Sequence, residues 1–314
     1  MLAVVGGALV AIQGRLNGDL STAGAGVLLA SLFSFVGTLV ALVLVIAVSG
    51  RAARVVRMLR ERGSWWWFVL GVLSIPIVLG FSYGVPIVGV AVSSVCAVAG
   101  QIVSGLTLDA RGLGVPRPIG LSGRRLLAAV LAVAGLTVGI AAASGSASAG
   151  LAQAVLVGLL LFAGGLTIAG QIAGNGRITQ VSGDPLVAAF SSQLGGTAVM
   201  AAIVGVAAAA GGLDAATLPD EPSQWYLYLG GPLGAVITTA SAWAVRHLGT
   251  FALTLAAVGG QLVAALAVDL ARGMTAHWST WVAALTIAGA TALGVAPGRP
   301  SPDEPAGGAR GVSR

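Results

Sequence analysis

The sequence predicts an all-α integral membrane protein with about ten transmembrane helices, arranged as two inverted five-helix repeats. Of its 314 residues, 57% are hydrophobic and only 8% are charged, and the mean hydropathy is +0.97. A soluble chain of this length needs more polar residues to cover its core. Trp65 to Asp109 also aligns without a gap with Trp225 to Asp269. The aligned Trp, Gln and Asp residues indicate a duplication, because composition bias alone would not superpose them.

Apolar stretches of about 20 residues predict the transmembrane helices of both halves. The first half contains residues 2–18, 25–49, 65–83, 87–108 and 125–144, and the second contains residues 151–174, 185–211, 225–244, 248–268 and 279–297. The chain is expected to turn back at Tyr83 to Pro86 and at Arg246-His247. We predict repeats at residues 1–145 and 150–297, and a disordered cytoplasmic tail at 298–314.

The basic residues predict how the chain is oriented. Arginine alone supplies the basic excess behind the net charge of +6, because the sequence contains no lysine. Many arginines lie in two predicted loops, Arg51 to Arg62 and Arg111 to Arg125, and basic loops favour the cytoplasm. We therefore expect both termini on the cytoplasmic side of the inner (plasma) membrane. Because each repeat has an odd number of helices, the second repeat enters the membrane from the opposite side and is inverted. The positions of the arginines in these loops indicate membrane topology and not nucleic-acid binding.

Amide side chains are the main polar groups inside the predicted helices. Gln101 and Gln261 are equivalent, and each lies roughly 12 Å from its helix end, near the membrane midplane. Two further pairs of amides, spaced four residues apart, each share one helix face directed at a neighbouring helix or a cavity. The alternatives are interhelical hydrogen bonds for the amides and interfacial anchoring for two aromatic residues. The residues predicted to line a substrate pathway are Gln13, Asn17, Tyr83, Gln101, Gln171, Asn175, Trp243 and Gln261.

Two equivalent aspartates lie at the predicted helix ends. Inversion would place Asp109 at the cytoplasmic end of its helix and Asp269 at the external end. Two-sided access to a central site needs polar groups in such positions, so we predict that both act in gating or coupling. The alternative is that each caps a loop through a nearby arginine, Arg111 or Arg272.

The sequence offers little for catalysis, metal binding or cofactor binding. His247 and His277 lack the spacing of metal ligands, and Cys96 stands alone within a predicted helix. The external acidic pair Asp220-Glu221 has no histidine beside it, whereas membrane enzymes use carboxylate pairs or His clusters. We therefore expect no enzyme activity, no metal and no cofactor.

Short motifs carry a family resemblance. In the first half they are Gln13-Gly14-Arg15-Leu16-Asn17, Ser34-Phe35-Val36-Gly37-Thr38, Trp65 to Gly71, and Gly100-Gln101 with Asp109. In the second half they are Gly176-Arg177-Ile178, Gly195-Gly196-Thr197, Trp225 to Gly231, and Gly260-Gln261 with Asp269. This pattern resembles the YdcZ-like inner-membrane proteins of the drug/metabolite transporter (DMT, EamA-like) superfamily.

The resemblance implies a fold of two inverted five-helix repeats and export of a small molecule through a central cavity. With the polar residues above, it predicts a secondary transporter that moves a small metabolite or drug-like solute by alternating access. The expected partners are this solute and the lipid bilayer. The sequence leaves open whether the protein also forms a homodimer. The alternative function is a non-catalytic membrane subunit or permease partner of a larger complex.

Overall fold

The computed structural model describes residues 2–113, 118–144, 150–213, 216–273 and 278–295, and the regular elements in these ranges are helices. The first half contains α1 (Leu2–Leu20), η1 (Ser21–Ala25), α2 (Gly26–Val48), α3 (Ala52–Arg62), α4 (Trp65–Val69), η2 (Leu70–Ser74), α5 (Ile75–Ala110) and α6 (Gly123–Ser144). The second contains α7 (Leu151–Ser182), α8 (Pro185–Ala209), η3 (Pro222–Leu229), α9 (Gly230–Ala271) and α10 (Trp278–Val295). The prediction of an all-helical protein is confirmed. The predicted tail at 298–314 lies outside the described residues.

Several helical stretches are long and apolar enough to cross a membrane. Among the described residues there are five, namely Ala3–Val48, Trp65–Ala110, Leu151–Ser182, Pro185–Ala209 and Pro222–Ala271. Large aliphatic side chains also lie on the outer surface, such as Leu44 and Val263 with exposed fractions of 58% and 70%. Such side chains are stable facing lipid, so the chain is a membrane protein.

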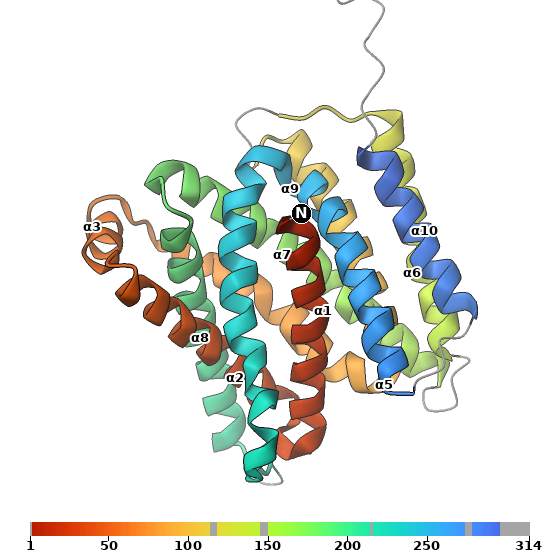
Figure 1. Cartoon of the computed structure of the whole chain (residues 1–314), viewed down its shortest axis with the longest axis horizontal. Helices are drawn as coiled ribbons and strands as arrows, with labels where there is room; N and C mark the ends of the chain where they lie inside the picture. Colours follow the sequence, from red (N-terminus) through yellow and green to blue (C-terminus); the bar gives the residue numbers. More distant parts are fainter. Residues whose placement is uncertain (1, 114–117, 145–149, 214–215, 274–277, 296–314) are drawn as a thin grey trace, which may run out of the picture.

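The helices form one bundle with α3 and α8 at one edge and α6 and α10 at the other (Figure 1). Between these edges, α1 packs against α9, and α7 packs against α5. Each of these pairs joins one helix of the first half to one of the second. The halves are therefore interleaved in space, although each is continuous in sequence.

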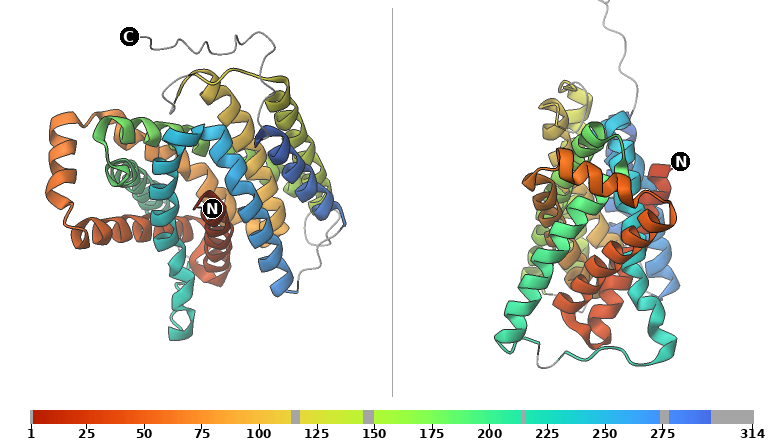
Figure 2. Two further views of the ribbon diagram at one scale, coloured as in Figure 1. Left: turned by 45° about the horizontal axis from the view of Figure 1, so that its top comes forward. Right: turned by 90° about the vertical axis from the view of Figure 1, so that its left-hand side faces the viewer.

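The arginine-rich segment predicted as a loop forms a helix, α3. Its sequence is rich in Ala, Arg, Leu and Met, which are strong helix formers. Val55 is buried and packs in the same apolar cluster as Met58 and Leu59, while Arg54 and Arg57 are exposed. The helix lies at the edge of the molecule and runs across its neighbours (Figure 2).

Glycines bring the backbones of the paired helices together. A β-carbon on Gly7 of α1 would strike the carbonyl oxygen of Ala257 on α9, and one on Gly165 of α7 would strike that of Ala97 on α5. Ala97 and Ala257 are equivalent in the duplication, so Gly7 and Gly165 must be equivalent too. Small residues at such crossings allow the close van der Waals contact that holds membrane helices together.

This packing corrects part of the motif alignment. With Gly7 matched to Gly165, Gln13 falls on Gln171 and Asn17 falls on Asn175. The Gly-Arg pairs that suggested the alignment, Gly14-Arg15 and Gly176-Arg177, are not equivalent. The amides, and not the arginines, are the repeated feature of α1 and α7.

The two long helices α5 and α9 are each broken at one glycine. Gly89 has φ 80° and ψ 168°, and Gly249 has φ 79° and ψ 163°. This backbone conformation is accessible almost only to glycine. The predicted turns at Tyr83 to Pro86 and at Arg246-His247 are wrong by a few residues, because those segments remain helical and each break falls at the following glycine.

Candidate functional site

Side chains from six helices surround a cavity of about 160 Å³ in the interior. The helices are α1, α2, α5, α7, α8 and α9, and the short segment η2 adds Ser74, so both halves contribute. The lining holds amides and hydroxyls but, among the described residues, no Asp, Glu, Lys or Arg. The polar residues of the lining are Gln13, Asn17, Ser34, Thr38, Ser74, Gln101, Gln171, Asn175, Gln193, Thr238, Ser241, Thr254 and Gln261.

The apolar walls of the cavity differ between the halves. Phe81 of α5 lies against Gly14 of α1, where a β-carbon would strike the phenyl ring. The residue equivalent to Phe81 in α9 is Ser241, and Ile172 of α7 stands in place of Gly14. The large aromatic side chain is thus present at one end of the cavity and replaced by a hydroxyl at the other.

Polar residues of the cavity wall form hydrogen bonds between helices, both within the first half and between the halves. Ser34 Oγ accepts from Asn17 Nδ2 at 3.1 Å and from Gln13 Nε2 at 3.3 Å. Thr38 Oγ1 donates to the carbonyl oxygen of Gly231 at 2.7 Å, and Gln193 Nε2 donates to that of Phe35 at 3.0 Å. These bonds join α1 to α2, and α2 to α9 and α8. The interhelical hydrogen bonds raised as an alternative therefore exist, on side chains that also line the cavity.

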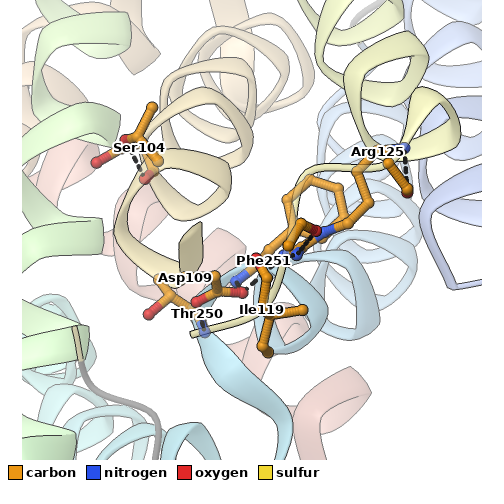
Figure 3. A network of polar contacts seen from close by, with 9 residues as sticks. Ser104, Asp109, Ile119, Arg125, Thr250 and Phe251 are labelled. Carbon is orange, nitrogen blue, oxygen red and sulfur yellow. Dashed lines mark hydrogen bonds and ion pairs between the residues drawn. The ribbon is translucent and has the colours of Figure 1, made fainter. Parts of the chain in front are cut away.

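Asp109 caps the break in the opposite half of the molecule. Its carboxylate is fully buried and accepts hydrogen bonds from the backbone N–H groups of Thr250 at 2.9 Å and Phe251 at 3.1 Å, directly after Gly249. It also pairs with Arg125 Nη2 at 2.8 Å, and the Arg125 guanidinium lies 4.4 Å from the centre of the Phe251 ring (Figure 3). Three donors thus hold one carboxylate where two helices meet, and one of them is the guanidinium stacked on Phe251.

Asp269 repeats this arrangement on the other break. It is 5% exposed and accepts from the backbone N–H groups of Val90 at 3.1 Å and Ala91 at 2.8 Å, directly after Gly89. Each aspartate therefore caps the N-terminal end of a helix that starts at the broken glycine of the other half. The duplication extends to this pair of reciprocal caps.

The suggested arginine partners of the aspartates are wrong. Asp109 pairs with Arg125, and not with Arg111, which is exposed. Arg272 pairs with Asp19 at 2.7 Å, so it is not the partner of Asp269. Sequence proximity suggested both partners, whereas the backbone brings Arg125 from the start of α6 and Asp19 from the end of α1.

The cavity includes most but not all of the predicted pathway residues. Tyr83 is half-buried beside the main apolar cluster, and neither it nor Trp243 is part of the lining. Trp243 is 43% exposed and lies 5.1 Å from the His247 ring. The predicted residues in the lining are Gln13, Asn17, Gln101, Gln171, Asn175 and Gln261.

The prediction omitted Gln193 and all the serines and threonines of the lining. Gln193 was visible as an amide within an apolar stretch, and Ser34 with Thr38 shows the same four-residue spacing as the amide pairs. Hydroxyls are less informative, because they often bond to the carbonyl one turn back, as Thr38 does to Ser34. Within the described residues, His, Cys, Asp and Glu form no group of three that could hold a metal ion.

The interleaved helices and the uncharged polar cavity define a polytopic membrane protein with an internal solute-sized site. The family model DMT_YdcZ, described as "Putative inner membrane exporter, YdcZ", matches residues 1–138 and again residues 156–296. The chain belongs to this family, and the two matches confirm the duplication. The family is one of membrane exporters, which are transporters and not enzymes.

Comparison with solved structures supports the fold alone. One chain, described only as "Crystal structure of protein", aligns with a TM-score of 0.61 at 16% sequence identity and covers 94% of each chain. The search of curated proteins gave no match.

Proposed function

We propose that this protein is a secondary transporter that exports a small metabolite or drug-like solute by alternating access. The cavity is the observation that carries the proposal. It lies where α1, α5, α7 and α9 meet and takes equivalent amides from both halves, such as Gln101 and Gln261. Secondary transporters built from repeats bind their substrates between the repeats near the membrane midplane.

The proposal includes ten membrane crossings in two inverted repeats, at residues 1–145 and 150–297. The stretches Trp65–Ala110 and Pro222–Ala271 contain 46 and 50 residues, far more than the roughly 20 that one crossing needs. Division at Gly89 and Gly249 gives each of them two crossings. The exchange of partners between α1 with α9 and α7 with α5 also supports a pseudo-twofold relation between the halves.

Inversion predicts opposite locations for two equivalent positions. We expect Ser64→Cys to react with a membrane-impermeant maleimide only from the cytoplasmic side, and Gln224→Cys only from the external side. The measurement uses spheroplasts and inverted vesicles in a Cys96→Ala background, because Cys96 is the single native cysteine. Labelling of both positions from the same side would refute the inverted architecture and cytoplasmic placement of both termini.

In this mechanism the reciprocal caps are the gating elements. Asp109 and Asp269 each connect two helices of opposite halves. If one half moves against the other, these hydrogen bonds must therefore be lost, or the helix breaks at Gly89 and Gly249 must move together with the aspartates that cap them. Asp109 has an additional bond to Arg125, so the two ends of the pathway are held unequally.

The transport proposal predicts specific losses in reconstituted protein. We expect Gln101→Leu and Gln261→Leu to slow uptake of a transported solute by roughly 2- to 12-fold each, the value of one net hydrogen bond. Trp243→Phe is the control, because Trp243 does not line the cavity. Proteoliposomes are assayed with a broad panel of metabolites and drugs. If no solute moves while a control transporter works, the protein is not a transporter of this kind.

A further inference from the structure

Three polar atoms in the wall of the cavity have no hydrogen-bond partner within the protein. They are Oδ1 of Asn175 on α7, and Nε2 of Gln261 and Oγ1 of Thr254 on α9. Each residue is at most 3% exposed. A buried donor or acceptor without a partner is destabilising, so such groups in native proteins usually have a ligand or an ordered water. All three atoms are almost inaccessible to a molecule of the size of water, so an occupant of the cavity reaches this acceptor, donor and hydroxyl only when the side chains turn slightly toward it.

The equivalent residue of the first half is already occupied. Asn17 is the counterpart of Asn175, and its amide donates to Ser34. The residue matched with Ser34 in the second half is Gln193, which donates to the carbonyl oxygen of Phe35. The unpartnered atom of Asn175 is its acceptor, Oδ1, and not the Nδ2 donor that Asn17 uses. The equivalent amides are therefore bonded differently: Gln13 and Asn17 both donate to Ser34, whereas one polar atom of Asn175 has no partner.

The unpartnered atoms lie on two adjacent helices. Thr254 and Gln261 are two turns apart and share one face of α9, about 10 Å along the axis. Ile172, one turn before Asn175, packs in the same apolar cluster as Leu253. Asn175 and Thr254 are therefore near the same end of the cavity, with Gln261 further along it.

The site gives no counterion to a charged solute. The described lining contains no acidic or basic side chain. The two equivalent carboxylates at the helix breaks, Asp109 and Asp269, are already bonded to backbone N–H groups. A charge buried without a partner is strongly unfavourable. The chemistry of the wall therefore favours an uncharged occupant.

The rest of the wall is apolar and suits an apolar part of a solute. Phe81, Ile77, Ile168 and Leu253 supply much of this surface. The volume of about 160 Å³ is close to the roughly 150 Å³ of an engineered protein cavity that holds one benzene molecule. One aromatic ring, or an aliphatic group of similar size, fits such a space.

We propose that the cavity binds an uncharged solute with an apolar body about the size of one ring and with polar groups that both donate and accept hydrogen bonds. When these side chains turn toward the solute, a donor of the solute meets Asn175 Oδ1, an acceptor meets Gln261 Nε2, and the Thr254 hydroxyl takes either role. That this solute is the exported substrate rests on the proposed transport function, whereas its binding does not.

Three small molecules of similar shape and different charge test whether the cavity prefers an uncharged solute. Benzamide is neutral, benzoate is an anion and benzamidine is a cation at neutral pH. We expect benzamide to bind the purified protein in lipid nanodiscs, measured by calorimetry and by a rise in melting temperature. Benzoate and benzamidine are expected to bind at least about tenfold more weakly, because neither finds a counterion. Equal or tighter binding of either ion, or no binding of benzamide, would overturn the proposal.

Isosteric variants test the polar contacts. Thr254→Val is expected to weaken benzamide binding by roughly 2- to 12-fold, the value of one hydrogen bond. It should leave the binding of toluene, which has no polar group, unchanged. The matched control is Ser94→Ala, because Ser94 is equivalent to Thr254 and also unpartnered but does not line the cavity. Benzamide binding that is insensitive to Thr254→Val, or equally sensitive to Ser94→Ala, would refute the assignment.

The outcomes separate this inference from the transport proposal. Transport of a charged solute by proteoliposomes, with no binding of benzamide, would refute the substrate class and leave the transporter. Selective binding of benzamide, with no transport of benzamide or any panel solute, would refute the transporter and leave the binding site.

Discussion

Arg125→Met is expected to lower the free energy of unfolding by about 3–5 kcal/mol, the cost of leaving one partner of a buried ion pair uncompensated. Asp109, its partner, is fully buried and would keep only the two backbone N–H donors of Thr250 and Phe251. Methionine keeps an apolar stem but removes the guanidinium, and with it the contact with the Phe251 ring and the hydrogen bonds to the carbonyl oxygens of Ile119 and Gly120. The loss therefore reports the guanidinium as a whole, and the charge is separated by the double variant below. Reversible unfolding of the purified protein in mixed micelles measures it.

Two further variants make this result specific. Arg111→Met removes an exposed arginine close to Asp109 in sequence, and its effect is expected to stay within about 0.5 kcal/mol. Adding Asp109→Asn to Arg125→Met should recover part of the loss, because the uncompensated charge is then absent. Equal effects of Arg111→Met and Arg125→Met would mean that the ion pair of Asp109 has no role in stability.

Features that depend on one helix were predictable from the sequence. An amide in an apolar stretch is visible without a structure, because lipid-facing amides are unfavourable and so point inward. Gln101 and Gln261 were found in this way, and both line the cavity. The duplication added the equivalence of the two halves. The all-helical membrane fold followed from hydropathy, because helices and closed barrels are the stable ways to satisfy the backbone in lipid.

Features that join distant segments were not predictable. The caps connect Asp109 to Thr250 and Asp269 to Val90, which are 141 and 179 residues apart in the sequence. Gly89 and Gly249 are two of 48 glycines, and only the structure shows which of them break a helix. Proline and charge were the stronger local signals for a turn. They placed the breaks a few residues too early, because the capping carboxylate comes from the other half.

Gly249→Ala is expected to lower the free energy of unfolding by about 1–3 kcal/mol through backbone strain alone. The backbone at Gly249 has φ 79° and ψ 163°, where a β-carbon is disfavoured. The two N–H groups that follow bind Asp109, and hydrogen bonds to a charged group are worth about 1.5–3 kcal/mol each. If the strained backbone displaces them, the loss becomes larger than strain alone explains. The same unfolding assay measures it.

Gly259 provides the control within the same helix. A β-carbon there meets nothing within 4 Å, so Gly259→Ala is expected to be neutral or to stabilise α9 by about 0.5–1 kcal/mol. Coupling to the cap is tested by combining Gly249→Ala with Asp109→Asn. If the strain acts by displacing the capped N–H groups, the double variant should lose less than the sum of the single losses. Strict additivity, or a Gly249→Ala as stable as Gly259→Ala, would show that the break and the carboxylate are energetically independent.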